Sequence, residues 1–206
     1  MNPDGNLRPL RGVDRLADVL DRYRELASRV DAGVSHLVGA HRSRMKCAAG
    51  CAACCTRISV LPVEWYIVRA VIGADAMTDL NEKSNSPPRA LVSHPPPNPC
   101  GFLRDGVCSI YRDRPLVCRV HGLPLRYRVV SYDETGVVSD DAFTTVWCDL
   151  NFTGQDPNRP TFTDGECFDM NALNTELDAL NAAFLRTAAG HRFAGKHGVF
   201  LCDGSA

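Results

Sequence analysis

The sequence lacks the segments that carry a protein into or through a membrane. Residues 1–12, MNPDGNLRPLRG, contain no apolar run and no small-residue cleavage site, so we expect no secretory signal peptide. A transmembrane helix needs about 18 consecutive apolar residues. The best candidate, residues 65–74, is interrupted by Arg69. We therefore expect a cytoplasmic protein with no membrane partner.

An excess of charge of either sign is also missing. Lys and Arg number 23 against 24 Asp and Glu, so the formal net charge is −1. A chain this close to neutral has no electrostatic footprint for nucleic acid, and we expect none as a partner. A Gly-rich phosphate loop, a GxSxG elbow and an HExxH helix are absent as well, which removes three common classes of enzyme.

The length and the composition are those of one globular domain. The 206 residues are 45% hydrophobic and 23% charged, which excludes a disordered chain and a coiled-coil rod. No internal repeat is present. We expect a flexible leader at 1–12, a single domain at 13–187 and a C-terminal extension at 188–206.

Two segments show the three- and four-residue spacing of amphipathic helices, at 13–45 and 169–187. Gly33 weakens the first and allows a break at 31–33. A third helix is expected from Pro62 to about Leu80, with Glu64 in its first turn, where it is either a helix-start charge or a general base. Residues 58–61 predict a short strand or an extended lead-in to this helix, and 81–99, with six prolines, a loop.

A turn signal at 133–136 separates two β-rich runs, 123–132 and 137–147, which predicts a β-hairpin. The expected fold class is α+β, mainly α. Two or three amphipathic helices would surround a loop-rich cysteine and metal core, with the small hairpin attached.

Cysteine is the abundant residue, with ten in the chain. Thiols stay reduced in the cytoplasm, so a cysteine-rich cytoplasmic protein indicates metal binding more than disulfides. The first block is Cys47-x3-Cys51-x2-Cys54-Cys55. Neighbouring side chains diverge in helical and in extended backbone, so we expect Cys54 and Cys55 to serve different centres.

Four further cysteines at 100, 108, 118 and 148 bring the total to eight, the number that two four-thiolate centres require. The predicted metal ligands are Cys47, Cys51, Cys54, Cys55, Cys100, Cys108, Cys118 and Cys148. Cys167 and Cys202 fall outside this set and are interpreted as structural or incidental, Cys202 because it lies close to the chain end.

Basic residues flank both blocks and would offset thiolate charge. They are Arg42, Arg44, Lys46 and Arg57 around the first block, and Arg112, Arg114, Arg119 and His121 around the second. His121 follows Cys118 by three residues, so it is either a metal ligand or a histidine of the core.

These cysteine blocks, with PCGFL at 99–103 and GVCSIYRDRPLVCR at 106–119, resemble the YkgJ-like cysteine-cluster family. HGLPL at 121–125 and WCDLNF at 147–152 are similar to a bacterial subgroup of it. The resemblance covers about residues 15–187 and implies a domain that chelates zinc or iron. Flagellin lysine methylases have a related cysteine arrangement, so the resemblance also admits an enzyme.

The sequence leaves the metal and the role open. Zinc and an iron–sulfur cluster both accept four thiolates. The expected function is zinc or iron binding with a redox, metal-handling or structural role. The alternatives are a cluster-assisted enzyme, either an oxidoreductase or a protein-modifying methyltransferase, and a zinc-stabilised interaction module.

Overall fold

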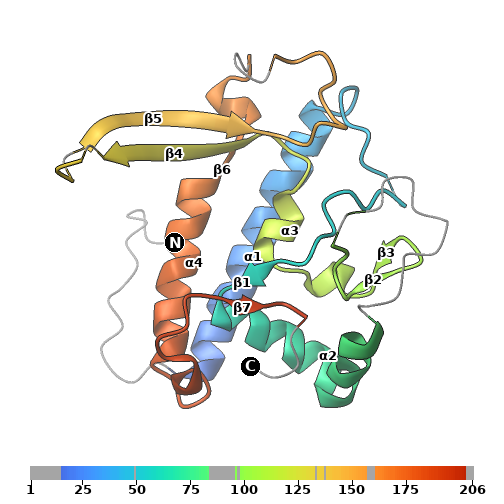
Figure 1. Cartoon of the computed structure of the whole chain (residues 1–206), viewed down its shortest axis with the longest axis vertical. Coiled ribbons are helices and arrows are strands. Elements are labelled where there is room, and N and C mark those ends of the chain that lie inside the picture. The colour runs from blue at the N-terminus through green and yellow to red at the C-terminus, as the bar shows by residue number, and fades with distance from the viewer. Residues whose placement is uncertain are drawn as a thin grey trace.

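The computed structural model describes residues 15–48, 50–83, 96, 98–132, 134–136, 138–156 and 161–202. The predicted leader at 1–12 and most of the predicted loop at 81–99 lie outside the described residues. Within them, two long helices stand side by side and the smaller elements pack around them (Figure 1).

The two long helices are α1 (Leu16–Ala40) and α4 (Met170–Leu185). The apolar stripe of each faces the core, as its spacing predicts. α4 begins at Asp169, whose carboxylate accepts hydrogen bonds from the N–H groups of Asn171 and Ala172. α1 continues unbroken through Gly33, where a Cβ would only touch a ring atom of Phe168 at 3.4 Å.

The third helix, α2 (Pro62–Lys83), is broken at Gly73, whose φ of 73° lies outside the helical region. Its first turn is attached to α4 because the buried Asn181 accepts a hydrogen bond from the Val63 N–H at 3.2 Å. This polar contact between two otherwise apolar faces fixes the start of α2 relative to α4.

The predicted hairpin is present as β4 (Leu125–Tyr132) and β5 (Val138–Val146), paired antiparallel. The short β6 (Phe168–Asp169) pairs in parallel with the start of β4 and leads directly into α4. The hairpin extends away from the helices at one end of the molecule (Figure 1). Its return strand β5 ends two residues before Cys148, so the hairpin brings that cysteine back to the body.

The C-terminal segment packs on the core. Phe193 is fully buried against Trp65, with ring centroids 5.4 Å apart. The strand β7 (Val199–Phe200) pairs antiparallel with β1 (Ser59–Val60), and Leu201 is buried. The described part of 188–206 therefore packs on the same core as α2 and α4, and the predicted boundary at residue 188 stays a prediction.

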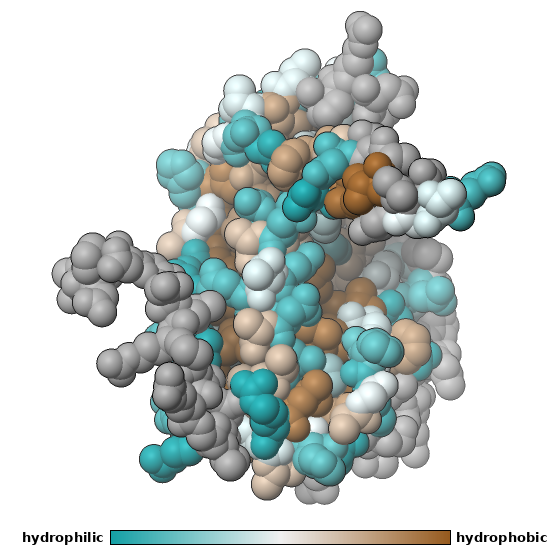
Figure 2. Space-filling model, turned by 90° about the vertical axis from the view of Figure 1, so that its left-hand side faces the viewer, coloured by the Kyte–Doolittle hydropathy of each residue, from teal (hydrophilic) through white to brown (hydrophobic). Residues whose placement is uncertain are grey.

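Short elements complete the described fold: β2 (Leu103–Arg104) pairs with β3 (Val107–Cys108), a 3-10 turn covers Tyr111–Asp113, and α3 spans Leu116–Val120. The predicted α+β, mainly α class is confirmed. Figure 2 shows hydrophobic residues interleaved with hydrophilic ones on the side where α4 lies. Among the helices in the described ranges, none combines the length and apolarity that a membrane span requires.

Candidate metal centre

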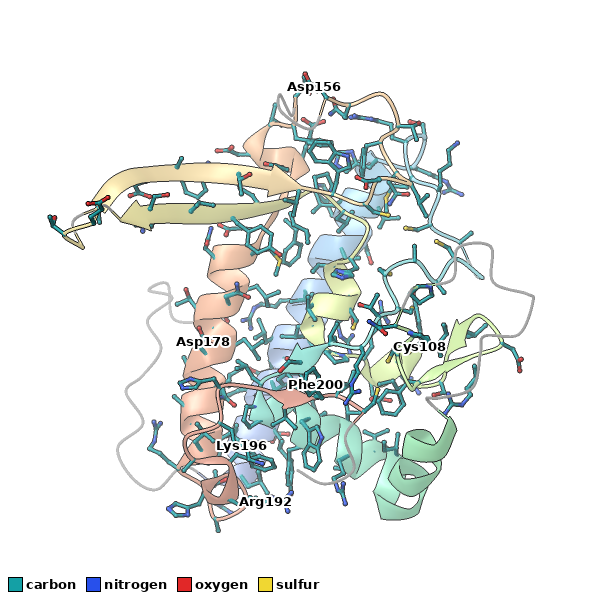
Figure 3. All side chains as sticks on the ribbon, viewed as in Figure 1. Cys108, Asp156, Asp178, Arg192, Lys196 and Phe200 are labelled. Atoms are coloured by element: carbon teal, nitrogen blue, oxygen red, sulfur yellow. The ribbon has the colours of Figure 1, made fainter. Side chains whose placement is uncertain are left out.

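The eight predicted cysteines come from four separate segments of the chain. Residues 47–55 follow α1, Cys100 and Cys108 flank β2, Cys118 lies in α3, and Cys148 follows β5. β3, with Cys108 labelled in Figure 3, lies on the opposite side of α1 from α4. The fold therefore gathers on one side of α1 residues that lie up to about a hundred positions apart.

Three thiols form what we call the first thiol group, Cys47, Cys51 and Cys148. Burial raises the pKa of Cys47, and the nearby thiols of Cys148, Cys51 and Cys54 raise it further. Charges raise each other's pKa in this way only when they are close. The structure thus brings Cys148 to the first cysteine block across about a hundred residues of sequence.

Asn151 holds the first thiol group in place. Its fully buried side chain donates from Nδ2 to the Cys47 sulfur at 3.2 Å and to the Gly122 carbonyl at 2.8 Å. Its Oδ1 accepts from the Lys46 N–H at 2.7 Å. An amide donating to a ligand sulfur is the kind of contact that orients thiolates in metal sites. Sequence analysis missed this role, although Asn151 lies three residues after Cys148 in the quoted WCDLNF motif.

Gly122 permits this arrangement by its lack of a side chain. Its φ is +96°, and a Cβ there would lie 2.8 Å from the Cys47 sulfur and 3.2 Å from Asn151 Nδ2. Both the left-handed backbone and the close approach require glycine.

An aromatic cluster next to the first thiol group joins the two segments that bear it. The Phe152 ring packs edge-on against His41 and Phe162, at centroid distances of 5.1 Å in each case. The Arg44 guanidinium lies over the Phe152 ring at 5.0 Å, and the Arg44 carbonyl accepts from the Phe152 N–H. The end of α1 and the segment after β5 are thereby locked together, which positions Cys47 and Cys148.

Four thiols form what we call the second thiol group, Cys55, Cys100, Cys108 and Cys118. Burial raises the pKa of Cys118 to about 12, and Glu64, Cys108 and Cys54 raise it as well. Burial also raises the pKa of Cys108. Cys100 is held beside the first block because its N–H donates to the Cys55 carbonyl at 2.8 Å.

The side chains of the adjacent residues Cys54 and Cys55 were predicted to diverge, and they do not. A hydrogen bond between the Cys54 and Cys55 thiols raises the pKa of Cys54 and lowers that of Cys55. The two side chains therefore do not diverge, because the chain turns sharply at 53–54. Cys54 is still near members of both thiol groups, so the assignment of the pair to different centres stays a prediction.

Cys202 lies inside the cysteine constellation, against the expectation. It is buried, its sulfur lies 3.7 Å from that of Cys100, and it accepts a hydrogen bond from the Gly101 N–H at 3.1 Å. The bonds from Cys100 and Gly101 lower the pKa of Cys202 to about 7. Cys167 instead has a hydrogen bond with the Thr145 side chain, and none of the thiols above contributes to its raised pKa.

Glu64 is a buried residue and not an exposed helix-start charge. Its buried carboxylate accepts hydrogen bonds from the Leu116 N–H at 2.8 Å and the Tyr23 hydroxyl at 3.2 Å. Burial raises the pKa of Glu64, and these bonds oppose that rise. The carboxylate attaches α1 and α2 to the start of α3, and so positions Cys118.

The basic flanks act in different ways. Arg114 lowers the pKa of Cys108, and Arg57 that of Cys202, so these two cations do offset thiolate charge. Arg119 is instead a packing residue, paired with Asp31 at 2.6 Å and donating to the carbonyls of Arg112 and Arg114. Burial lowers the pKa of His121, which favours the neutral ring.

The donor set suits a soft or borderline cation such as zinc or iron. Of the seven thiols in the two groups, all but Cys47 belong to partly buried residues, where thiolates without a counter-charge are unfavourable. In the part of the chain that is described, no three His, Cys, Asp or Glu side chains yet converge at metal-binding distance. The Cys100 thiol contacts that of Cys202, and the Cys54 thiol hydrogen-bonds that of Cys55.

Comparison with known families gives one result. Residues 46–142 match the CxxCxxCC family, described as a "putative zinc- or iron-chelating domain". The match spans all of the eight cysteines except Cys148 and confirms the resemblance expected from the sequence. The searches of curated proteins and of solved structures returned no match.

Proposed function

We propose, on the basis of the match of residues 46–142 to the CxxCxxCC family, that the clustered thiols of this chain bind zinc or iron at two centres. Cys47, Cys51, Cys148 and Cys54 supply the first centre. Cys100, Cys108, Cys118 and Cys55 supply the second. The electrostatic neighbours of Cys47 support the first set, and those of Cys108, Cys118 and Cys55 support the second. Cys54 has neighbours in both sets, and we assign it to the first centre to complete four ligands there.

The observation that carries the proposal is the gathering of partly buried thiols from four segments on one side of α1. Burial and neighbouring thiols raise the pKa of Cys47, Cys108 and Cys118, which favours the neutral thiols over the thiolates. A bound cation reverses that balance, because it stabilises several thiolates at once.

We assign the centres a role in holding the fold together. Four thiolates fill a tetrahedral zinc site and leave no open position for a substrate. The ligands join the block at 47–55 to segments at 100–118 and at 148, and residues 45–57 contribute only Ala52 as a buried side chain among those described. Metal would therefore supply the attachment that hydrophobic contacts do not.

Metal analysis of the full chain, purified without oxygen and under reducing conditions, tests the proposal. Two equivalents of zinc in a colourless protein, or iron with sulfide and broad visible absorption, would support it. A protein that retains neither metal and takes up neither on reconstitution would contradict it. A single equivalent with four reactive thiols would leave one centre and refute the second.

Ligand variants then test the division into two centres. Cys148→Ser should lose metal from the first centre and Cys118→Ser from the second, each retaining the other equivalent. Cys167→Ser is the matched control, since Cys167 is also partly buried but lies apart from both thiol groups. If Cys148→Ser and Cys118→Ser release the same equivalent, the division is wrong.

A further inference from the structure

The C-terminal arm, residues 191–202, brings a cysteine to the second thiol group from outside the matched family segment. Phe193, Val199 and Leu201 are buried and anchor the arm in the core. The Leu201 N–H donates to the Ile58 carbonyl at 3.0 Å, which extends the pairing of β7 with β1. Cys202 follows immediately, so its backbone is fixed by the pairing and not by the chain end.

Gly198 allows the C-terminal arm to approach β1 closely. A Cβ on Gly198 would lie 2.4 Å from the Ser59 hydroxyl oxygen, which is inside van der Waals contact. β1 follows the first cysteine block by three residues. The C-terminal arm is therefore paired in a fixed register with the segment that follows Cys54 and Cys55.

The sulfur of Cys202 is placed where a ligand of the second centre would be. It lies 3.7 Å from the Cys100 sulfur, and it is close enough to Cys108 to influence that thiol electrostatically. The Gly101 N–H already donates to it at 3.1 Å, and the Arg57 side chain is near. Backbone N–H groups and cations around a sulfur are the surroundings that support a metal-bound thiolate.

We infer that Cys202 is a metal ligand of the second centre and shares its ion with Cys100. This inference rests on the proposed function, and it gives the chain nine candidate thiols for eight ligand positions. A tetrahedral ion has four positions, so one member of the second thiol group yields its position to Cys202. Metal binding would then clamp the C-terminal arm to the domain.

Cobalt is the probe for this inference, because its thiolate complexes absorb in proportion to the sulfur ligands bound. The full chain, kept reduced, is titrated with Co²⁺ in competition with a chelator. Cys202→Ser should bind one of its two cobalt ions at least about tenfold more weakly, with less thiolate absorption per ion. Cys167→Ser, the other cysteine outside the eight, should match the unaltered protein.

The outcomes separate the inference from the proposed function. An unaltered protein that binds no Co²⁺, zinc or iron would overturn the proposed function, and the inference with it. An unaltered protein with two cobalt ions, together with a Cys202→Ser variant of equal affinity and equal absorption, would overturn the inference alone.

Because Cys202 is buried, Cys202→Ser has to be checked for folding by circular dichroism. If it does not fold, the sulfur of Cys202 is replaced by selenium, which keeps the shape of the side chain. Selenium-edge spectroscopy of the zinc-loaded protein should then show a zinc neighbour at a little over about 2.3 Å. A selenium atom without a metal neighbour would refute the assignment.

Discussion

The two thiol groups are supported by different physics. Around the second group, Phe102, Ile110, Leu116 and Val120 are buried in the main core. Around the first, Cys47 is exposed, and its block contributes little to the core. Directed contacts hold the first group instead, through Asn151 and the rings around Phe152.

This difference indicates how strongly each thiol group depends on bound metal to stay assembled. Hydrophobic burial is non-directional and persists without an ion, so the second group should remain assembled in the apo protein. A block held by a few hydrogen bonds and an ion should loosen when the ion leaves. Four predictions follow from this comparison.

Removal of metal should have the largest effect, and it should be uneven. Structural metal sites contribute on the order of 10 kcal/mol to folding at neutral pH, comparable to the whole stability of a domain. Hydrogen exchange of chelator-treated, reduced protein should show strong loss of amide protection at 46–56 and a smaller loss at 100–120. Equal loss in both segments would remove the distinction between the groups.

Asn151→Ala should destabilise the protein by about 2–4 kcal/mol, because it leaves the Lys46 N–H and the Gly122 carbonyl without their partner. Metal should be lost from the first centre while the second is retained. Chemical denaturation and metal analysis measure the two effects. Asn171→Ala is the control, since Asn171 makes one exposed hydrogen bond with the Arg128 N–H and its loss should change stability by less than about 1 kcal/mol.

Gly122→Ala should weaken the first centre selectively. The variant forces a Cβ toward the Cys47 sulfur and strains a positive φ, at a cost of about 2–3 kcal/mol. Gly136→Ala has a similar φ of +79° in the hairpin turn and nothing within 4 Å, so it tests strain without the clash. If both variants reduce metal content alike, contact with Cys47 is not the cause.

Glu64→Gln should produce the smallest effect, a change in the pH dependence of stability. The pKa of Glu64 is raised above its usual 4.5 by burial, so its contribution is complete below that pH and is lost as pH rises through the folded value. The free energy of unfolding of the variant should therefore improve relative to the unaltered protein as the pH rises above 4.5.

Glu166→Gln provides a control of opposite sign for that experiment. Hydrogen bonds from Thr163 lower the pKa of Glu166, so its contribution is present above 4.5 and lost as pH falls. Denaturation curves measured at each pH give the free energy of unfolding of each variant relative to the unaltered protein. As the pH rises, this difference should increase for Glu64→Gln and decrease for Glu166→Gln. A change of the same sign in both variants would show that Glu64 is not the group that titrates.

Local patterns in the sequence were enough to locate most of the fold. The apolar spacing predicted α1 and α4 to within a few residues, and the turn at 133–136 predicted the hairpin. Both signals depend on residues that are close together in the sequence. The same holds for the short cysteine spacings that carry the family resemblance, which the family match confirms. The break that Gly33 would allow is absent because packing of α1 outweighs the low helix propensity of one glycine.

Long-range placement was decided only by the tertiary structure. No pattern around Cys202 predicted its contact with Cys100, since the pairing of β7 with β1 joins residues 140 positions apart. In the same way Asn151 and Glu64 are ordinary polar residues in the sequence and become positioning residues only where the fold buries them beside Cys47 and above α3. A sequence records which donors a chain has, whereas the distance between two of them depends on how the whole core packs.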